Sequence, residues 1–478
     1  MSLSRRFMTP AQPPEDFARL RSELDVPTDF PEEVRQVAAQ AARQGPRFPR
    51  DDATHLDLVT IDPPGSRDLD QAVHVEAGPA GGLVVHYAIA DVAAFVTAGD
   101  RVDTEAWDRG VSRYSPDLVT PLHPPELSEG AASLLPGQDR PAVLWTLTVD
   151  SAGALTDTRV RRALVRSRAQ LTYAQAQQAI DDGSDAMLGR LSQVGRLRAE
   201  REWVRGGVSL ELPDQEVYEA GTGRYALRYR APLPVEGWNA QISLLTGHAA
   251  GLMMVQARKG VLRTLPAPQA DTIDNLRRKA WALGLPWPRE VNYPDFVRTM
   301  DPHEPVEAAM ISQAAVGLRG AGYVAFDGEV PEHHRHEAIA DVYAHVTAPL
   351  RRLVDRYANE VVLAIAAGTP VPPWVTQRLA ELPRAMAQAR SRAGALDRAM
   401  LDLVEAQVLA GRVGQTFPAV VIRGGEKGVE VQLRDPAVTA WLDEKLQPGT
   451  EVTVRLADVD LVNRTTAFVC VGTCTGTV

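Results

Sequence analysis

The sequence is poor in cysteine and contains no long apolar run. Only Cys470 and Cys474 occur among its 478 residues. Two cysteines are too few for a disulfide framework, so we expect a protein of the reducing cytoplasm. No segment reaches the run of about 18 apolar residues that a membrane-spanning helix needs, and the residues after Met1 show no apolar core of a secretory signal. These absences predict a globular cytoplasmic protein without a membrane partner.

Lysine is also scarce. The chain has only Lys259, Lys279, Lys427 and Lys445, so almost all of its 51 basic residues are arginine. The formal net charge of -10 taken alone argues against a nucleic-acid partner. The argument is weak for a metal-dependent nuclease, because such an enzyme needs carboxylates and can gather its cations in a channel. Arginine binds phosphate through a two-pronged fork, although a genomic composition bias gives the same excess.

A short acidic stretch carries the clearest chemical signal. Asp62, Asp68 and Asp70 fall within nine residues, and a Pro-Pro-Gly-Ser segment after Asp62 predicts a turn between two strand-like runs, 56–61 and 72–75. Side chains two apart in an extended chain share a face, and the turn can bring Asp62 beside the other two. Mg²⁺ would offset the repulsion between the carboxylates, whose oxygens suit it. A solvated acidic loop is the alternative interpretation. We call residues 62–71 the acidic turn.

The first part of the chain predicts two short helices, at residues 15–24 and 32–43, separated by a proline-containing break. The pair resembles a helix-turn-helix. Two such helices are too small to form a core alone, so they must pack on the rest of the molecule. Recognition of nucleic acid and a structural collar are both open interpretations.

Two arginine-containing segments suggest contacts with phosphate. Five arginines lie in and just after a predicted hairpin at residues 143–160, and they fit either a phosphate-binding stripe or an exposed sheet face: Arg159, Arg161, Arg162, Arg166 and Arg168. Further on, Thr347 and Pro349 have the pattern of a helix start. Backbone N–H groups and Arg351 would then point toward an anion.

Beyond residue 411 the apolar residues alternate with a period of two. This pattern predicts strands at 416–422, 428–433, 450–457 and 465–471, joined by turns that contain Gly, Pro or Asp. Several short strands in one small segment predict a β-barrel of the OB type. The fold class is therefore α+β and multidomain, with a helical segment at 1–48, a large mixed α/β domain at 49–400 and a barrel at 408–478.

Five segments together resemble a known family. Residues 60–72, 88–92, 127–140, 205–209 and 343–352 are similar, in this order, to motifs of the catalytic (RNB) domain of the ribonuclease II and ribonuclease R family. The resemblance implies an RNB domain followed by an S1 domain of the OB type. Members usually carry cold-shock barrels ahead of the catalytic domain. The segment before residue 49 is too small for two of them, so the resemblance implies a short form.

The resemblance also implies roles for single residues. Asp62, Asp68 and Asp70 would hold Mg²⁺, with Asp70 catalytic. Gln71 stands where the family usually has a fourth aspartate. An amide oxygen can still bind Mg²⁺, but it brings no charge.

Three further side chains would handle the RNA. Arg351 would grip the scissile phosphate as a catalytic residue, and Tyr114 would stack on a terminal base. Arg352 would bind backbone phosphate or pair with Asp355 or Glu360.

Together with the acidic turn, the resemblance implies a monomeric, Mg²⁺-dependent hydrolytic exoribonuclease. It would degrade single-stranded RNA processively from the 3′ end and release nucleoside 5′-monophosphates. Gln71 motivates one alternative, a catalytically weakened protein of the same fold that only binds RNA, and so does Gly237, which stands where the family usually has one of two paired acidic residues. A phosphodiesterase that acts on small nucleotides is another alternative.

Overall fold

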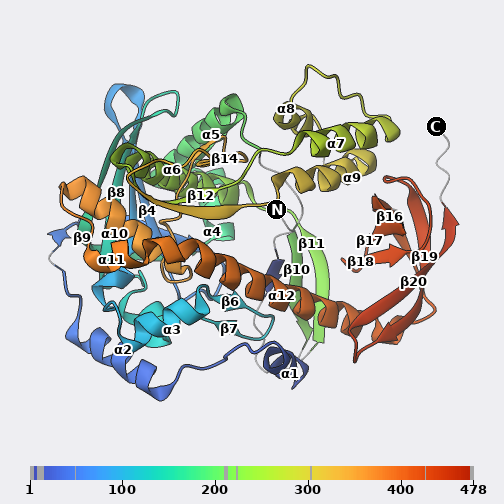
Figure 1. Cartoon of the computed structure of the whole chain (residues 1–478), viewed down its shortest axis with the longest axis horizontal. Helices are drawn as coiled ribbons and strands as arrows, with labels where there is room; N and C mark the ends of the chain where they lie inside the picture. Colours follow the sequence, from blue (N-terminus) through green and yellow to red (C-terminus); the bar gives the residue numbers. More distant parts are fainter. Residues whose placement is uncertain are drawn as a thin grey trace.

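The computed structural model describes residues 5–7, 15–48, 50–208, 214–221, 224–301, 304–425 and 427–473. A large α/β body occupies one end of the molecule and a small β-barrel the other, and the long helix α12 (Leu382–Leu409) runs between them (Figure 1). Within the described ranges, no helix combines the length and the apolar character needed to cross a bilayer.

The α/β body is built on a six-stranded sheet. Its order is β2-β9-β3-β4-β5-β8. Strand β9 is long enough to pair with both β3 and β8, so β8, the last strand in this order, also pairs with β9. The strands are β2 (Asp51–Asp52), β3 (Leu58–Asp62), β4 (Gln71–Ala77), β5 (Leu83–Ala90), β8 (Asp139–Val149) and β9 (Leu155–Thr172). The acidic turn therefore joins two neighbouring antiparallel strands, because Asp62 ends β3 and Gln71 begins β4.

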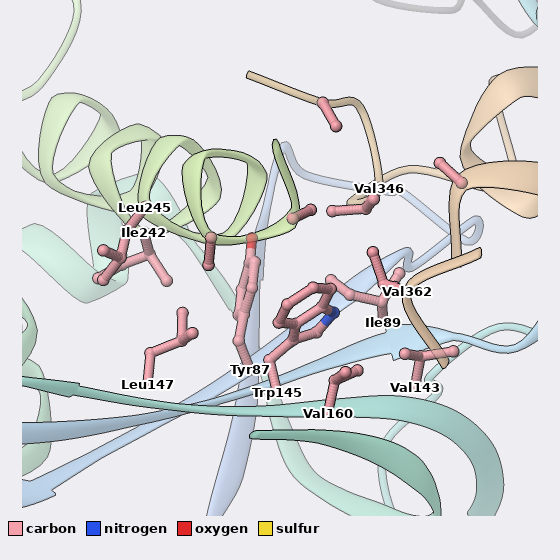
Figure 2. Close-up of a cluster of buried hydrophobic side chains, with 14 of the residues drawn as sticks. Tyr87, Ile89, Val143, Trp145, Leu147, Val160, Ile242, Leu245, Val346 and Val362 are labelled. Carbon is pink, nitrogen blue, oxygen red and sulfur yellow. The ribbon is translucent and has the colours of Figure 1, made fainter. Parts of the chain in front are cut away.

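The main core lies between this sheet and helix α6 (Pro234–Ala257) (Figure 2). Trp145 and Tyr87 rise from β8 and β5 toward α6, and both are almost completely buried. The Tyr87 hydroxyl is 2.8 Å from Ser243 Oγ on α6. Val346, in the loop before α10 (Leu353–Ala367), belongs to the same apolar cluster. Removing a side chain as large as Trp145 would lower the free energy of unfolding by about 3–5 kcal/mol. The loop packs on this stable core through Val346.

The two N-terminal helices form close to their expected bounds, as α1 (Glu15–Glu23) and α2 (Glu32–Gln44). They pack on different parts of the molecule. Phe17 of α1 joins the apolar cluster of α12 and the barrel, whereas Val34 of α2 joins a cluster beneath the sheet. Buried Arg21 on α1 also makes two hydrogen bonds, of 2.6 and 2.7 Å, to Asp117 of the α/β body. This packing is what the collar interpretation requires.

The remaining elements surround the sheet and connect it to the barrel. The helices are α3 (Arg101–Arg109), α4 (Tyr173–Asp181), α5 (Ala186–Arg205), α7 (Ala270–Ala282), α8 (Tyr293–Arg298), α9 (Pro305–Ala314) and α11 (Pro373–Arg378). The strands are β1 (Arg5–Phe7), β6 (Arg113–Tyr114), β7 (Val119–Thr120), β10 (Asp214–Gly221), β11 (Arg224–Arg230), β12 (Lys259–Thr264), β13 (Gly322–Asp327), β14 (Arg335–His336) and β15 (Asp341–Val342).

The C-terminal barrel confirms the expectation from the period-two pattern. Its strands are β16 (Thr416–Gly425), β17 (Gly428–Leu433), β18 (Thr439–Leu442), β19 (Glu451–Asp460) and β20 (Thr465–Thr473). They run in the order β18-β17-β16-β19-β20, and β18 also lies close to β20, so the barrel is nearly closed. Strand β18 was not predicted, because four residues next to a proline turn give too short an alternation.

Candidate active site

The acidic turn is anchored by its one aliphatic residue, Leu69. Leu69 is fully buried, its N–H donates to Ser133 Oγ at 3.0 Å, and its carbonyl accepts from the Leu134 N–H at 3.0 Å. Because side chains alternate along an extended segment, anchoring Leu69 on one side places Asp68 and Asp70 on the other. Asp70 is itself only 3% exposed.

The carboxylates of the acidic turn influence one another. Burial raises the pKa of Asp62 to about 6, and repulsion from Asp68 acts in the same direction. Burial also raises the pKa of Asp68, and it holds the pKa of Asp70 well above its ordinary value. The Arg351 guanidinium opposes the shift at all three aspartates. The three carboxylates and the Arg351 guanidinium therefore lie close enough to affect one another's charge state.

A loop of residues 346–352, which we call the arginine loop, faces the acidic turn. The Leu350 N–H donates to Asp70 Oδ1 at 2.8 Å, and Arg351 Nε lies 3.5 Å from Asp70 Oδ2. The Ala348 N–H donates to Asp355 Oδ1 at 2.7 Å. Two of the loop's backbone donors are thus bound to carboxylates of the protein itself.

The predicted helix start at Thr347 is wrong. Helix α10 begins only at Leu353, and residues 347–352 form an irregular turn. The pattern of Thr347 and Pro349 is compatible with a helix start, but the bonds from the loop to Asp70 and Asp355 impose another conformation. The expected anion site at the N-terminus of this helix therefore does not form, and Arg351 reaches the site from a turn.

Arg351 and Arg352 are adjacent but have different surroundings. Arg352 donates from Nε and Nη2 to the two carboxylate oxygens of Asp355, at 2.9 and 2.8 Å. The Arg351 side chain is 45% exposed beside the carboxylates. For Arg352 the structure shows the pair with Asp355, which was one of the interpretations left open. Its predicted contact with RNA stays a prediction, and a phosphate would have to compete with that carboxylate.

Tyr114 reaches the same place from β6. Its hydroxyl donates to Asp68 Oδ2 at 3.3 Å, and the residue keeps 37% of its surface exposed. Its segment is tied to the arginine loop, since the Ser112 N–H donates to the Arg351 carbonyl at 3.0 Å. Tyr114, Asp68 and Arg351 come from distant parts of the sequence, and the fold brings them together.

Gln71 is oriented by a backbone group. Its Nε2 donates to the carbonyl of Thr347. Among the residues that can be described, no group of three or more His, Cys, Asp or Glu side chains is placed so that it could hold a metal ion. The metal-binding roles expected for Asp62, Asp68, Asp70 and Gln71 accordingly stay predictions.

The five arginines in and just after the predicted hairpin all lie on β9, and each has an acidic partner. The pairs are Arg159 with Asp157, Arg161 with Asp51, Arg162 with Asp91 and Glu360, Arg166 with Asp139, and Arg168 with Asp57. An RNA phosphate would have to displace these acids. The arrangement agrees with the sheet-face interpretation and gives no support to a phosphate-binding stripe.

Sequence reasoning missed how the arginine loop is held from behind, because it named Asp355 only as a possible partner of Arg352 and did not name Asn359. Asp355 accepts the Ala348 N–H, and Asn359 Nδ2 donates to the Val346 carbonyl at 2.9 Å. Both are buried on α10. Their spacing of four places them on one face of a largely apolar helix, and this pair of polar residues was the available signal.

Comparisons with known proteins agree with this architecture. Residues 50–367 match the RNB domain, and residues 415–471 match the C-terminal S1 domain of RNase II-type exonucleases. Ribonuclease R of Escherichia coli (strain K12) is 27% identical over 439 residues, which cover 86% of this chain and 53% of the relative. The chain thus spans about half the length of that curated relative.

Two solved structures share the fold. The structure of Mycoplasma genitalium RNase R in complex with ribose-methylated single-stranded RNA superposes with a TM-score of 0.86 at 17% identity, covering 95% of this chain and 78% of the other. Yeast Ssd1, described as a pseudonuclease, gives a TM-score of 0.69 at 16% identity over 86% of this chain and 53% of its own. Because the RNB domain spans most of its length, this chain belongs to the RNB-domain family of ribonucleases.

Proposed function

We propose that the protein is a Mg²⁺-dependent 3′→5′ exoribonuclease that degrades single-stranded RNA processively to nucleoside 5′-monophosphates, acting as a monomer in the cytoplasm. One observation carries the proposal: the acidic turn, Arg351 and Tyr114 meet at a single place in an RNB domain. The name of the Escherichia coli relative and the RNA in the Mycoplasma genitalium complex support RNA as the substrate.

The acidic turn has the chemistry of a site for a divalent cation. Asp70 is buried and Asp62 and Asp68 are half-buried, all three have raised pKa values, and the Asp62 Oδ2 atom is buried without a hydrogen-bond partner. The carboxylate oxygens of Asp62, Asp68 and Asp70 would hold Mg²⁺, because this hard cation prefers oxygen ligands. When bound, Mg²⁺ would supply an activated water and stabilise the leaving oxygen.

The other groups of the site bind and orient the RNA. Arg351 offers a half-exposed guanidinium where negative charge would develop on the phosphoryl group. The ring of Tyr114 would stack on a terminal base, an interaction worth about 1–3 kcal/mol that tolerates any base. Asp70 and Asp355 keep Arg351 aimed by binding the backbone of its loop.

The proposal is tested with a single-stranded RNA that carries a label at its 5′ end. With Mg²⁺ we expect shortening from the 3′ end and release of mononucleotides, and EDTA should suppress both. A DNA of the same sequence is the control, since contacts with the 2′-hydroxyl distinguish RNA. Products that appear equally with EDTA, or cleavage within the strand, would refute the proposed reaction.

A second candidate is a protein of the RNB fold that binds RNA without cleaving it. Two observations favour it: Gln71 brings no charge and its amide is bound to Thr347, and the fold is shared with a pseudonuclease. The same assay separates the candidates. Retention of the labelled RNA without any product, in the presence of Mg²⁺, would support the second one.

A further inference from the structure

Gln71 links the acidic turn to the arginine loop. It is the first residue of β4, and it pairs with Ile89 in the sheet. Its side-chain amide donates from Nε2 to the Thr347 carbonyl in the arginine loop. A carbonyl oxygen only accepts hydrogen bonds, so this partner fixes which end of the Gln71 amide faces the loop. A carboxylate at this position would have no proton to donate.

The bond made by Gln71 is one of a pair from adjacent residues. Asp70 accepts the Leu350 N–H, and Gln71 donates to the Thr347 carbonyl, so two consecutive residues of the acidic turn hold the arginine loop at positions three apart. Behind the loop, Asp355 and Asn359 of α10 hold Ala348 and Val346. The segment that carries Arg351 is thereby fixed from the sheet on one side and from α10 on the other.

We infer that Gln71 is a positioning residue that fixes the arginine loop through its N–H donor. This inference rests on the proposed function for what Arg351 does. It explains how the neutral residue contributes to the site, since the amide orients the arginine in a way that an aspartate cannot.

The test measures amide hydrogen exchange in the protein without metal or RNA. Gln71→Glu keeps the shape of the side chain and removes the donor, whereas Gln71→Ala removes the whole amide without adding charge. One such hydrogen bond changes the opening equilibrium about three- to tenfold. We therefore expect peptides that contain Ala348 and Leu350 to exchange about three- to tenfold faster in both variants, and exchange elsewhere in the sheet to stay unchanged.

Gln170 provides a matched control. Its Nε2 donates to the Ser66 carbonyl at 2.8 Å, so Gln170→Ala removes the same kind of bond from the acidic turn instead of the arginine loop. Faster exchange should then appear near Ser66 and not at residues 346–352. In RNA hydrolysis, Gln71→Ala should lower kcat about tenfold with little change in KM, because the arginine is misaligned while base stacking at Tyr114 survives.

Unchanged exchange at residues 346–352 in both Gln71 variants would overturn the inference. A calorimetric titration with Mg²⁺ alone gives a second criterion. We expect Gln71→Ala to bind Mg²⁺ within about threefold of the unsubstituted protein, whereas a loss of tenfold or more without faster exchange would identify Gln71 as a ligand. The exchange measurement needs no nuclease activity. A chain that binds RNA without cleaving it would refute the proposed function and still report on Gln71.

Discussion

The arginines of β9 and the arginine of the acidic site have opposite surroundings. On β9 each arginine has an acidic partner, such as Asp139 for Arg166 at 2.7 Å. At the site a single guanidinium, Arg351, acts on three aspartates, so negative charge is in excess when these are ionised. The number of arginines in a segment is therefore a poor guide to a phosphate site. The local ratio of acids to bases distinguishes a surface of ion pairs from a site with an excess of negative charge.

The contrast is sharpest between neighbours in the arginine loop. Arg352 is bound at both ends of its fork by Asp355, whose side chain is fully buried. Arg351 is half exposed and 3.5 Å from Asp70. We propose that Arg352 stabilises the fold of the loop and that Arg351, the more exposed of the two, contacts the substrate.

The largest expected effect tests the acidic side of the contrast. Asp70→Asn should reduce hydrolysis of single-stranded RNA by at least about a thousandfold, because the site loses a metal-binding charge, while RNA affinity survives. The asparagine can still accept the Leu350 N–H, so the loop should keep its position. Steady-state kinetics and fluorescence anisotropy measure the two quantities. Asp139→Asn, which removes the negative charge beside Arg166, is the control, and unchanged turnover in Asp70→Asn would exclude a catalytic role.

Arg352→Ala tests the structural role of the paired arginine. The substitution leaves the carboxylate of Asp355 buried without its counter-charge, and we expect the free energy of unfolding to fall by about 3 kcal/mol. Urea unfolding checks this value. Arg351→Ala, at a half-exposed position, should change the same quantity by no more than about 0.5 kcal/mol. Equal losses in the two variants would remove the distinction between the neighbours.

Arg351→Ala tests the catalytic role of the exposed arginine. Loss of one group that stabilises transition-state charge should lower kcat about a hundredfold. Arg351→Lys should recover part of the rate, because it restores the charge without the planar fork. Arg166→Ala on β9 is the matched control and should leave kcat within about twofold. If both alanine variants lose activity alike, the pairing on β9 does not separate structural from functional arginines.

Asp62→Asn tests the excess of negative charge through its pH dependence. Burial raises the pKa of Asp62 to about 6, so the folded state holds this proton more tightly than the unfolded chain. The resulting stability is present below about pH 4 and is lost as the pH rises through about 6. Without metal at pH 8 the variant should be more stable by about 1–2 kcal/mol, because it lacks the ionised carboxylate that destabilises the folded state. The expected gain is small because the group is partly exposed, and it should vanish toward pH 4.

Mg²⁺ adds a second arm to this experiment. Excess Mg²⁺ should stabilise the unsubstituted protein more than Asp62→Asn and so narrow the difference at pH 8. Urea unfolding at a series of pH values, with EDTA or with Mg²⁺, measures both arms. A difference in the free energy of unfolding that depends neither on pH nor on Mg²⁺ would contradict a metal site with an excess of negative charge.

The local elements were readable from the sequence where local patterns specify them. Helix α2 follows from its proline break and periodicity, and β17 from alternation between glycine and proline turns. Strands β12 and β13 were missed because Lys259–Thr264 pairs with a partner about sixty residues away, inside a region whose composition favours helix. A strand of that kind is specified by its partner and not by its own residues.

Sequence alone determined the acidic turn and the C-terminal barrel, because the spacing of aspartates, prolines and apolar residues is local information, and the resemblance of five segments to known motifs indicated the family. Only the tertiary structure decided which arginine is bound to an acid, where α10 begins and what Gln71 holds. Those outcomes depend on bonds such as Leu350 to Asp70, which joins residues 280 positions apart. A buried donor or acceptor takes whichever partner the fold places beside it, and no local pattern of residues specifies that partner.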